Sequence, residues 1–210
     1  MPKATERQSQ RDQILEAALQ HVPFDGWKRR SLFAGAVEAA FDAATAKRLS
    51  PRGGDDLLGH LDVWTDRRLV EDVDQEAIDR LRVRERIARL VRMRLDILAP
   101  HREALRRAIA ARLLPSNAIA AGPALWRSMD LIWAIAGDRA DDASYYTKRG
   151  LLLGVWTSTF FYWLEDQSPS FEESWAFLDR RIENVMQIGK LRGQVEGLVK
   201  NFGRFNPLRA

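Results

Sequence analysis

Residues 150–164 form a run of fifteen positions without a single charge. A membrane span, a packed core and a pocket for an apolar ligand are the alternatives for such a run. A spanning helix needs about 20 apolar residues, whereas this run is shorter and is flanked by charged pairs at 148–149 and 165–166. We therefore expect a helix that is buried on most sides in a globular fold. Its aromatic residues are Trp156, Phe160, Phe161, Tyr162 and Trp163.

The composition suits one globular domain, or one domain with a small appendage, because 46% of the 210 residues are hydrophobic and 30% are charged. The absence of cysteine excludes disulfides and thiolate metal sites, and it favours a reducing compartment. Residues 1–13 are polar and contain Glu6, so they resemble neither a secretory signal nor a mitochondrial presequence. We expect a cytoplasmic protein.

Apolar residues recur at helical spacing along nearly the whole chain, and no stretch alternates with the period of a strand. The sequence therefore predicts an all-α fold. The expected helices cover residues 11–22, 30–40, 42–49, 55–73, 78–98, 101–114, 122–138, 150–164 and 168–190.

Three positions carry signals for helix ends. Asp42 is the predicted N-cap of the helix over 42–49. Gly137 is predicted to end the helix over 122–138. Ser170 followed by Glu173 has the spacing of a capping box, and we expect it to begin the last long helix.

Arginine is concentrated between residues 80 and 112, where eleven arginines face three acids and leave a local balance of +8. The arginines fall between the apolar positions of a predicted helix. A solvated helix surface is the simpler interpretation, and a stripe that follows the phosphates of a nucleic acid is the alternative.

Residues with catalytic chemistry form no pattern of a known kind. The three histidines, His21, His60 and His101, lack the spacing of a metal site. The chain also lacks a G-x-S-x-G sequence and a glycine-rich phosphate loop after a strand. We expect no enzymatic activity, no metal and no cofactor.

Three short helices followed by a longer helical body resemble the TetR-type repressors, in which the third short helix lies in the major groove. Here that helix covers 42–49 and offers only Lys47 and Arg48, with Thr45 as a possible phosphate contact. The Y-x-x-F signature that usually ends it is replaced by RLSPRGGDDLL. On the arrangement of its helices alone, a TetR-family transcription regulator that senses an apolar ligand is the alternative function.

The aromatic side chains on two neighbouring predicted helices are candidates for the wall of a lipid-accepting cavity, since pockets for apolar ligands often lie between helices. Ordinary core packing is the competing interpretation, because aromatic stripes at helical spacing usually belong to cores. The predicted lipid-binding residues are Met93, Ile97, Trp126, Met129, Trp133, Leu152, Trp156, Phe160 and Trp163.

The last 21 residues, 190–210, read as a weak amphipathic helix, with cations around one apolar side and three glycines that reduce its stability as a free helix. Such a helix can gain its order at a membrane surface. The predicted membrane-binding residues are Leu191, Val195, Leu198, Val199, Phe202 and Phe205.

Five stretches together resemble the coenzyme Q (ubiquinone) biosynthesis protein nine family in its bacterial form. They are ILEAALQHVPFDGW (14–27), RLSPRGGDDL (48–57), and the stretches over 83–108, 125–138 and 145–186. The resemblance implies a TetR-like helical bundle that forms a homodimer and has lost DNA binding. It also implies a non-catalytic protein that binds an isoprenoid quinone or a phospholipid, lies peripherally on the inner membrane, and presents an intermediate to the di-iron demethoxyubiquinone hydroxylase.

The resemblance further implies a surface for the hydroxylase around an N-W-Y-T-[KR]-R motif. The last four positions match at 146–149, whereas Ser144 and Tyr145 depart from the motif. The implied partner-binding residues are Asp130, Trp133, Tyr145, Tyr146, Lys148 and Arg149. The expected division of the chain is a disordered N-terminus over 1–11, a helix-turn-helix-like unit over 12–60, a lipid-binding and dimerisation body over 61–189, and the membrane-binding tail over 190–210.

Overall fold

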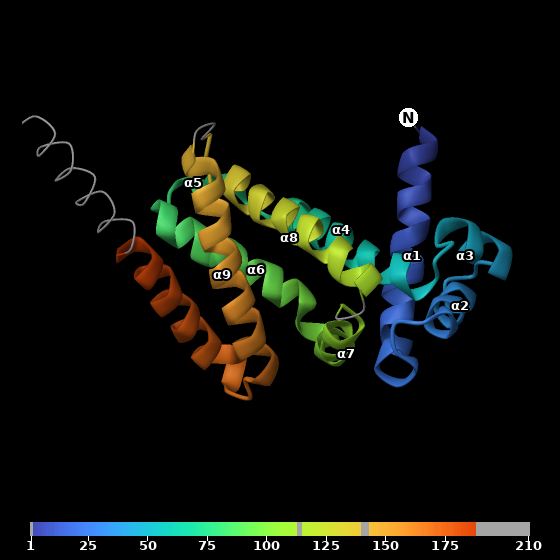
Figure 1. Ribbon diagram of the computed structural model, residues 1–210. Helices are drawn as coiled ribbons and strands as arrows, with labels where there is room; N and C mark the ends of the chain where they lie inside the picture. The colour runs from blue at the N-terminus through green and yellow to red at the C-terminus, as the bar shows by residue number, and fades with distance from the viewer. Residues whose placement is uncertain (1, 113–114, 140–142, 188–210) are drawn as a thin grey trace, which may run out of the picture. The chain divides into compact units, whose positions relative to one another are not determined.

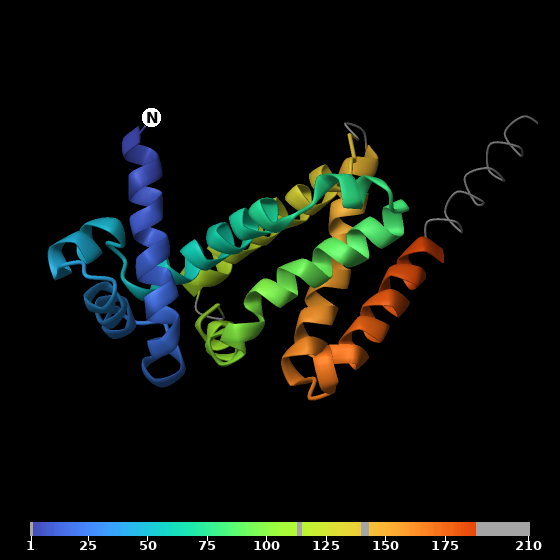
Figure 2. The ribbon, with the colours of Figure 1, turned by 180° about the vertical axis from the view of Figure 1, so that it is seen from behind.

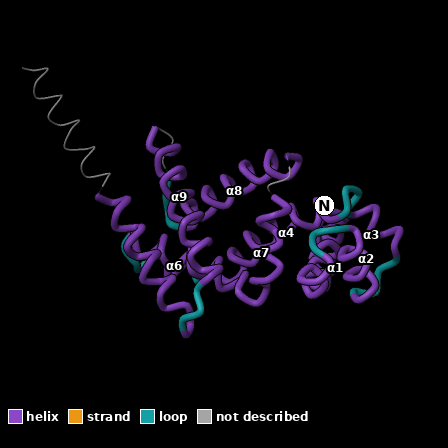
Figure 3. Tube along the Cα trace, turned by 60° about the horizontal axis from the view of Figure 1, so that its bottom comes forward, coloured by secondary structure: helices purple, strands orange, loops and turns teal. Residues whose placement is uncertain are grey.

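A computed structural model of the chain describes residues 2–112, 115–139 and 143–187 (Figure 1). All regular structure within these ranges is helical, which confirms the predicted all-α class (Figure 3). The chain divides into two compact units, Met1–Arg149 and Gly150–Ala210. The predicted membrane-binding residues of the tail lie outside the described residues.

The first unit begins with helices α1 (Pro2–Asp25), α2 (Arg29–Glu38) and α3 (Ala43–Leu49). Helices α1 and α2 approach closely at Gly35, where an added Cβ atom would lie 2.5 Å from the backbone nitrogen of Ala18. The buried face of α1 consists of Ile14, Leu15, Ala18, Leu19 and Val22, apolar residues at helical spacing.

Helix α1 is longer than predicted at both ends. It begins at Pro2, so the expected disorder over 1–11 is wrong for residues 2–11. These residues include Lys, Ala, Glu, Arg and Gln, all good helix formers. The helix also continues through Pro23 and ends at Asp25, just before Gly26, whose φ of 72° is one that glycine adopts readily.

Helix α3 begins as predicted, because the backbone N–H of Thr45 donates to the Asp42 carboxylate over 2.7 Å. This hydrogen bond lowers the pKa of Asp42. The loop before α2 is joined to a distant part of the same unit by one buried hydrogen bond, in which the Trp27 indole Nε1 donates to the carbonyl oxygen of Ala104 over 2.9 Å.

The rest of the first unit comprises α4 (Gly54–Asp72), α5 (Gln75–Asp79), α6 (Val83–Leu98), the short 3-10 helix η1 (Ala99–His101), α7 (Arg102–Arg112) and α8 (Pro115–Ile135). Helix α4 runs alongside α8 and also contacts α6 (Figures 1 and 2). The buried apolar side chains that join these three helices include Leu57, Leu61, Leu69, Leu90, Val91, Leu95 and Ile132.

Several arginines of the 80–112 stretch bind other parts of the first unit instead of forming a continuous surface stripe. Arg94 is only 2% exposed, and its guanidinium donates to Asp66 and to Ser128, each over 3.0 Å. Arg86 donates to three backbone carbonyl oxygens, one of them that of Ala136 just beyond α8. A solvated surface, the simpler interpretation, is therefore wrong for Arg94, because a buried guanidinium is tolerated when it is paired.

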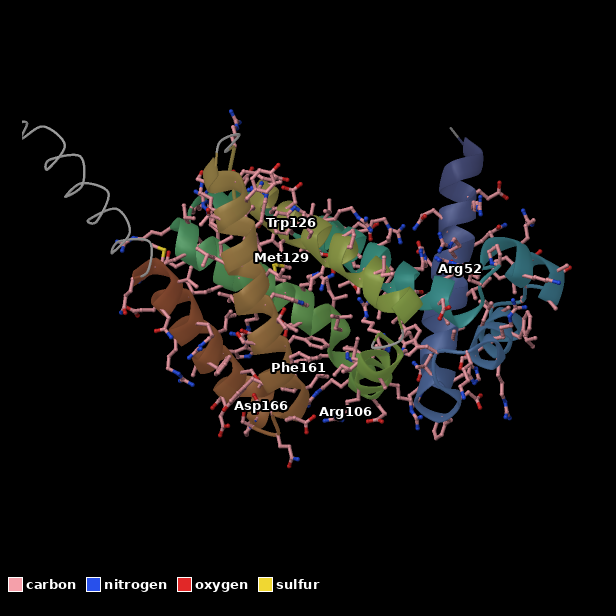
Figure 4. The ribbon with its side chains drawn as sticks, viewed as in Figure 1. Arg52, Arg106, Trp126, Met129, Phe161 and Asp166 are labelled. Atoms are coloured by element: carbon pink, nitrogen blue, oxygen red, sulfur yellow. The ribbon has the colours of Figure 1, made fainter. Side chains whose placement is uncertain are left out.

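The second unit takes in most of α9 (Ala143–Glu165), the 3-10 helix η2 (Pro169–Phe171) and a final helix described over 172–187. The predicted cap at Ser170 is wrong. Ser170 has a φ of 51° inside η2, and Asp166 instead accepts from the backbone N–H groups of Ser168 and Ser174 (Figure 4). Burial would raise the pKa of Asp166, but these hydrogen bonds outweigh it and lower the pKa to about 2.

The structure bears on the three alternatives for the uncharged run over residues 150–164. Within the described residues, no helix combines the length and the apolar character that crossing a bilayer requires. Trp163 is fully buried, and its ring lies 6.1 Å from that of Phe160 and 5.8 Å from that of Phe171. In the second unit, this run therefore packs ring against ring.

Candidate functional site

The turn from α8 into α9 brings together two acids and two cations. Helix α8 ends at Ile135, and Gly137 follows with a φ of 87°, as predicted for the residue that ends this helix. The chain reverses here, so Asp138 faces the first turns of α9. Its carboxylate accepts from Lys148 Nζ over 2.6 Å and from Arg149 Nη1 over 3.1 Å.

Arg149 is the centre of this cluster. Its Nε donates to the Asp130 carboxylate over 2.6 Å, so the guanidinium binds both acids at once. Burial would raise the pKa of Asp138, but the hydrogen bonds from Lys148 and Arg149 outweigh it and hold the pKa below its usual value. The same acids raise the pKa of Arg149 against the effect of its own burial. The ion pair between Asp138 and Arg149 therefore favours the charged form of both side chains.

Aromatic rings surround these ion pairs. The Cζ atom of Arg149 lies 3.5 Å from the ring centre of Tyr145, a cation–π distance. The Tyr146 ring lies 5.1 Å from that of Tyr145 and 6.3 Å from that of Trp126. The indole Nε1 of Trp133 donates to the backbone oxygen of Lys148 over 3.1 Å.

The six predicted partner-binding residues thus lie in one corner of the first unit, but they differ in exposure. The Tyr146 side chain is 69% exposed, and the Asp130 side chain is also accessible. Arg149 is only 3% exposed. A partner can therefore contact Tyr146 and Asp130 directly, whereas the buried Arg149 binds Asp130 and lies on the ring of Tyr145, the neighbour of Tyr146. We name the group of Asp130, Trp133, Asp138, Tyr145, Tyr146, Lys148 and Arg149 the α8–α9 corner.

Asp138 was not among the residues that the sequence singled out. A signal was present, because an acid directly after a helix-ending glycine is held in a defined position. The Lys-Arg pair ten residues later supplies matching charge. The pairing depends on the direction of the turn between α8 and α9, which spacing alone does not give.

The nine predicted lipid-binding residues fall in both units. In the first unit, Met129 is fully buried, while Met93, Ile97, Trp126 and Trp133 are half-buried. Figure 4 shows Trp126 and Met129 on α8. In the second unit, Leu152, Trp156 and Trp163 are buried, and the Trp156 ring stacks on that of Phe160 at 6.0 Å. The structure thus gives each residue an environment within its own unit, and their joint role in binding a lipid stays a prediction.

The exposed face of α3 and the histidines are weaker candidates for a functional site. Helix α3 exposes Ala43, Ala44, Lys47 and Arg48, a surface with two cations for reading DNA. Among the histidines, His60 is 2% exposed and its Nε2 lies 2.8 Å from Asp12 Oδ1, which is a structural contact between α1 and α4. Within the described ranges, no three His, Asp or Glu side chains gather in a way that could hold a metal ion.

Comparison with known proteins finds similarity to one family. The model of the COQ9 family matches residues 118–189, which include the α8–α9 corner. The ubiquinone biosynthesis protein COQ9, mitochondrial, of Drosophila melanogaster is 32% identical over 201 residues, or 92% of this chain. The protein COQ9-A of Xenopus laevis is 34% identical over 190 residues, and human COQ9 is 29% identical over 190 residues; both alignments cover 87% of this chain.

These relatives are longer than the present chain, which spans about 60% of their length. Among solved structures, the TetR transcriptional regulator from Nitrosomonas europaea ATCC 19718 aligns with a TM-score of 0.69 and 23% identity. That alignment covers 84% of this chain and 98% of the regulator. It confirms the predicted TetR-like fold.

Proposed function

We propose, since this chain is a relative of the COQ9 family, that it acts in ubiquinone biosynthesis as a non-catalytic lipid-binding protein. It binds an isoprenoid quinone intermediate and presents it, at the membrane, to the di-iron demethoxyubiquinone hydroxylase. The observation that carries the proposal is the α8–α9 corner, within the family-matched residues. There the exposed Tyr146 ring packs against Tyr145, whose ring lies on the buried guanidinium of Arg149.

The corner suits a protein partner for a physical reason. Hot spots of protein interfaces are enriched in Tyr, Trp and Arg, and they lie in rigid surroundings. Tyr146 is flanked by the rings of Trp126 and Tyr145, and Tyr145 is held by Arg149. The ring is therefore fixed before a partner arrives, so less conformational entropy is lost on binding.

The partner is tested by measuring the affinity of the purified chain for the hydroxylase by calorimetry. We expect Tyr146→Ala to weaken the complex by about 2 kcal/mol, or roughly thirtyfold. Phe24→Ala is the matched control, because Phe24 is also an aromatic residue of the first unit and is 84% exposed. Equal affinities of the Tyr146→Ala variant and the unaltered chain would remove the corner from the interface.

Lipid binding is supported by the concentration of apolar rings on α8 and α9 and by the relationship to ubiquinone biosynthesis proteins. Native mass spectrometry of the chain, purified from cells that make ubiquinone, tests it. We expect a bound mass that corresponds to a prenylated quinone or a phospholipid. A protein that carries no lipid in such a preparation, and takes up none from mixed micelles, would contradict this part of the proposal.

The chain is further proposed to act as a homodimer that lies peripherally on the inner membrane and binds the membrane through residues 190–210. The cationic and apolar residues of that segment support this role, because a neutral apolar surface with nearby cations binds anionic leaflets reversibly. Light scattering coupled to gel filtration gives the oligomeric state, and a monomeric mass would exclude the dimer.

A further inference from the structure

The first unit contains a polar cavity of about 500 Å³, and no residue of the α8–α9 corner lines it. Residues of α1, α4, α7 and α8 line it, together with Arg52 from the loop before α4 (Figure 4). None of the nine predicted lipid-binding residues takes part in the lining. Its volume lies within the range of small-molecule sites, which is about 300–1,000 Å³.

Four arginines line this cavity, and two of them are already paired. Arg112 Nη2 donates to both carboxylate oxygens of Asp62, over 2.9 and 2.8 Å. Arg52 donates to Asp56 through its Nε and through its backbone N–H, each over 2.8 Å. These pairs occupy much of the hydrogen-bonding capacity of both groups, so they are not the strongest candidates for binding a ligand.

The other two arginines, Arg11 and Arg127, have no ion-pair partner within the described parts of the chain. The Nε atom of Arg11 is buried and has no hydrogen-bond partner. Burial lowers the pKa of Arg11, and nearby Asp56 and Asp12 only partly offset that effect. A partly desolvated guanidinium with unused donors is a costly arrangement that an anion would relieve.

Small residues keep the cavity open between these cations. An added Cβ atom at Gly59, on the α4 side, would meet no atom within 4 Å. On the α8 side, Ala121 and Ala124 complete the lining with short side chains. The space in front of Gly59 is therefore free for a ligand, and a large side chain at that position would fill it without displacing the helix.

We propose that this cavity binds a phosphate group, with Arg11 of α1 and Arg127 of α8 as its principal ligands. A phosphate has enough oxygens to accept hydrogen bonds from two guanidinium groups at once, whereas a carboxylate has only two oxygens for both. Three carboxylates, those of Asp55, Asp56 and Asp62, line the same cavity and disfavour long polyanions such as nucleic acids. The site therefore suits a compact phosphate monoester, either free in solution or as the head group of a lipid.

The experiment uses the full chain and measures binding of glycerol 3-phosphate by calorimetry, with acetate as the carboxylate comparison. We expect glycerol 3-phosphate to bind more tightly than acetate. Arg11→Gln and Arg127→Gln should each weaken binding about ten- to hundredfold, the range expected for a charged hydrogen bond. Arg107→Gln is the matched control, because Arg107 is an exposed arginine of α7 outside the cavity lining.

Gly59→Phe tests the cavity without changing an arginine, so it still tests the proposal if a change at Arg11 disturbs folding. It should abolish binding while leaving the circular dichroism spectrum and the melting temperature unchanged. The lipid source is tested with vesicles of phosphatidic acid, comparing the unaltered chain with Gly59→Phe so that the tail contributes equally to both. Weaker vesicle binding by Gly59→Phe indicates a head group, and equal vesicle binding indicates a soluble ester. The proposal is overturned if glycerol 3-phosphate does not bind at millimolar concentration, or if Gly59→Phe binds it as well as the unaltered chain.

Discussion

The guanidinium of Arg149 lies over the ring of Tyr145 at 3.5 Å while it binds the carboxylates of Asp130 and Asp138. One buried side chain therefore fixes an aromatic ring and two acids of the α8–α9 corner. This relationship separates residues that a partner touches from residues that hold the surface in shape, and the two groups should respond differently to substitution.

Replacing Arg149 with Met should lower the free energy of unfolding by about 3 kcal/mol, because it removes the ion pairs with Asp130 and with the buried Asp138, which keeps only Lys148 as a partner. It should also weaken hydroxylase binding, whereas Tyr146→Ala should weaken binding without loss of stability. Urea denaturation and calorimetry measure the two effects. Adding Asp138→Asn to Arg149→Met should recover part of the lost stability, and a purely additive double variant would show that the two residues are not coupled.

Acidification should destabilise the first unit through His60. Burial, with a contribution from Arg11, lowers the pKa of His60 from 6.5 to about 4 despite the hydrogen bond with Asp12. The folded state therefore favours neutral His60, whose stabilising effect is complete above pH 6.5 and is lost as the pH falls through 4. The expected loss is about 3 kcal/mol.

The measurement for His60 is the free energy of unfolding between pH 7 and pH 4. His60→Gln should show a flatter profile over this range, because glutamine is neutral and still offers a donor to Asp12. If the two profiles have the same slope, His60 is not the group that titrates.

Gly35→Val should destabilise the contact of α1 with α2 by about 3 kcal/mol, since the new side chain would collide with the backbone of Ala18. Gly59→Ala is the control at a helical glycine with open space, and it should raise stability by up to about 1 kcal/mol. The melting temperatures of the Gly35→Val and Gly59→Ala variants, measured by thermal denaturation, test these two expectations. A stable Gly35→Val protein would mean that α1 and α2 can separate at little cost.

Replacing Phe202 and Phe205 with Ser should abolish co-sedimentation with anionic vesicles and leave the helical circular dichroism spectrum intact. The two rings are the largest apolar groups of the proposed membrane-binding tail. Phe24→Ser, at an exposed ring of α1, provides the control and should sediment with vesicles as the unaltered chain does. Unchanged sedimentation of the Phe202 and Phe205 variant would contradict the membrane role of the tail.

Duplex DNA should not be shifted by this chain at physiological salt. Helix α3 exposes only Lys47 and Arg48 as cations, and much of the arginine stretch binds other parts of its own unit. An electrophoretic shift with a random duplex library tests this. Binding whose logarithm falls steeply with the logarithm of the salt concentration would instead support the regulator alternative.

Features that depend on neighbouring residues were predictable from the sequence. The Asp42 cap, the helix end at Gly137 and the buried stripe of α1 each arise within a few residues of chain. The Ser170 cap was mispredicted because the backbone N–H of Glu173 donates to the Ser168 hydroxyl instead, and the next N–H, that of Ser174, donates to the charged Asp166.

Features that depend on distant residues were not predictable in the same way. Arg94 reads as one more surface arginine, because its partners Asp66 and Ser128 lie 28 and 34 residues away in the chain. The polar cavity was missed for the same reason, since its lining comes from four helices and one loop. The α8–α9 corner was located through the resemblance to a family, and the structure added Asp138 and the burial of Arg149.

The hydrogen bond from Trp27 to Ala104 also bears on the order in which the protein is made. The donor emerges from the ribosome long before its acceptor, with 77 residues between them. Until α7 has been synthesised, the buried indole N–H has no native acceptor, and the first three helices remain incomplete. Nascent chains that stop before residue 104 should accordingly be more readily cut by proteases near Trp27 than chains that include α7.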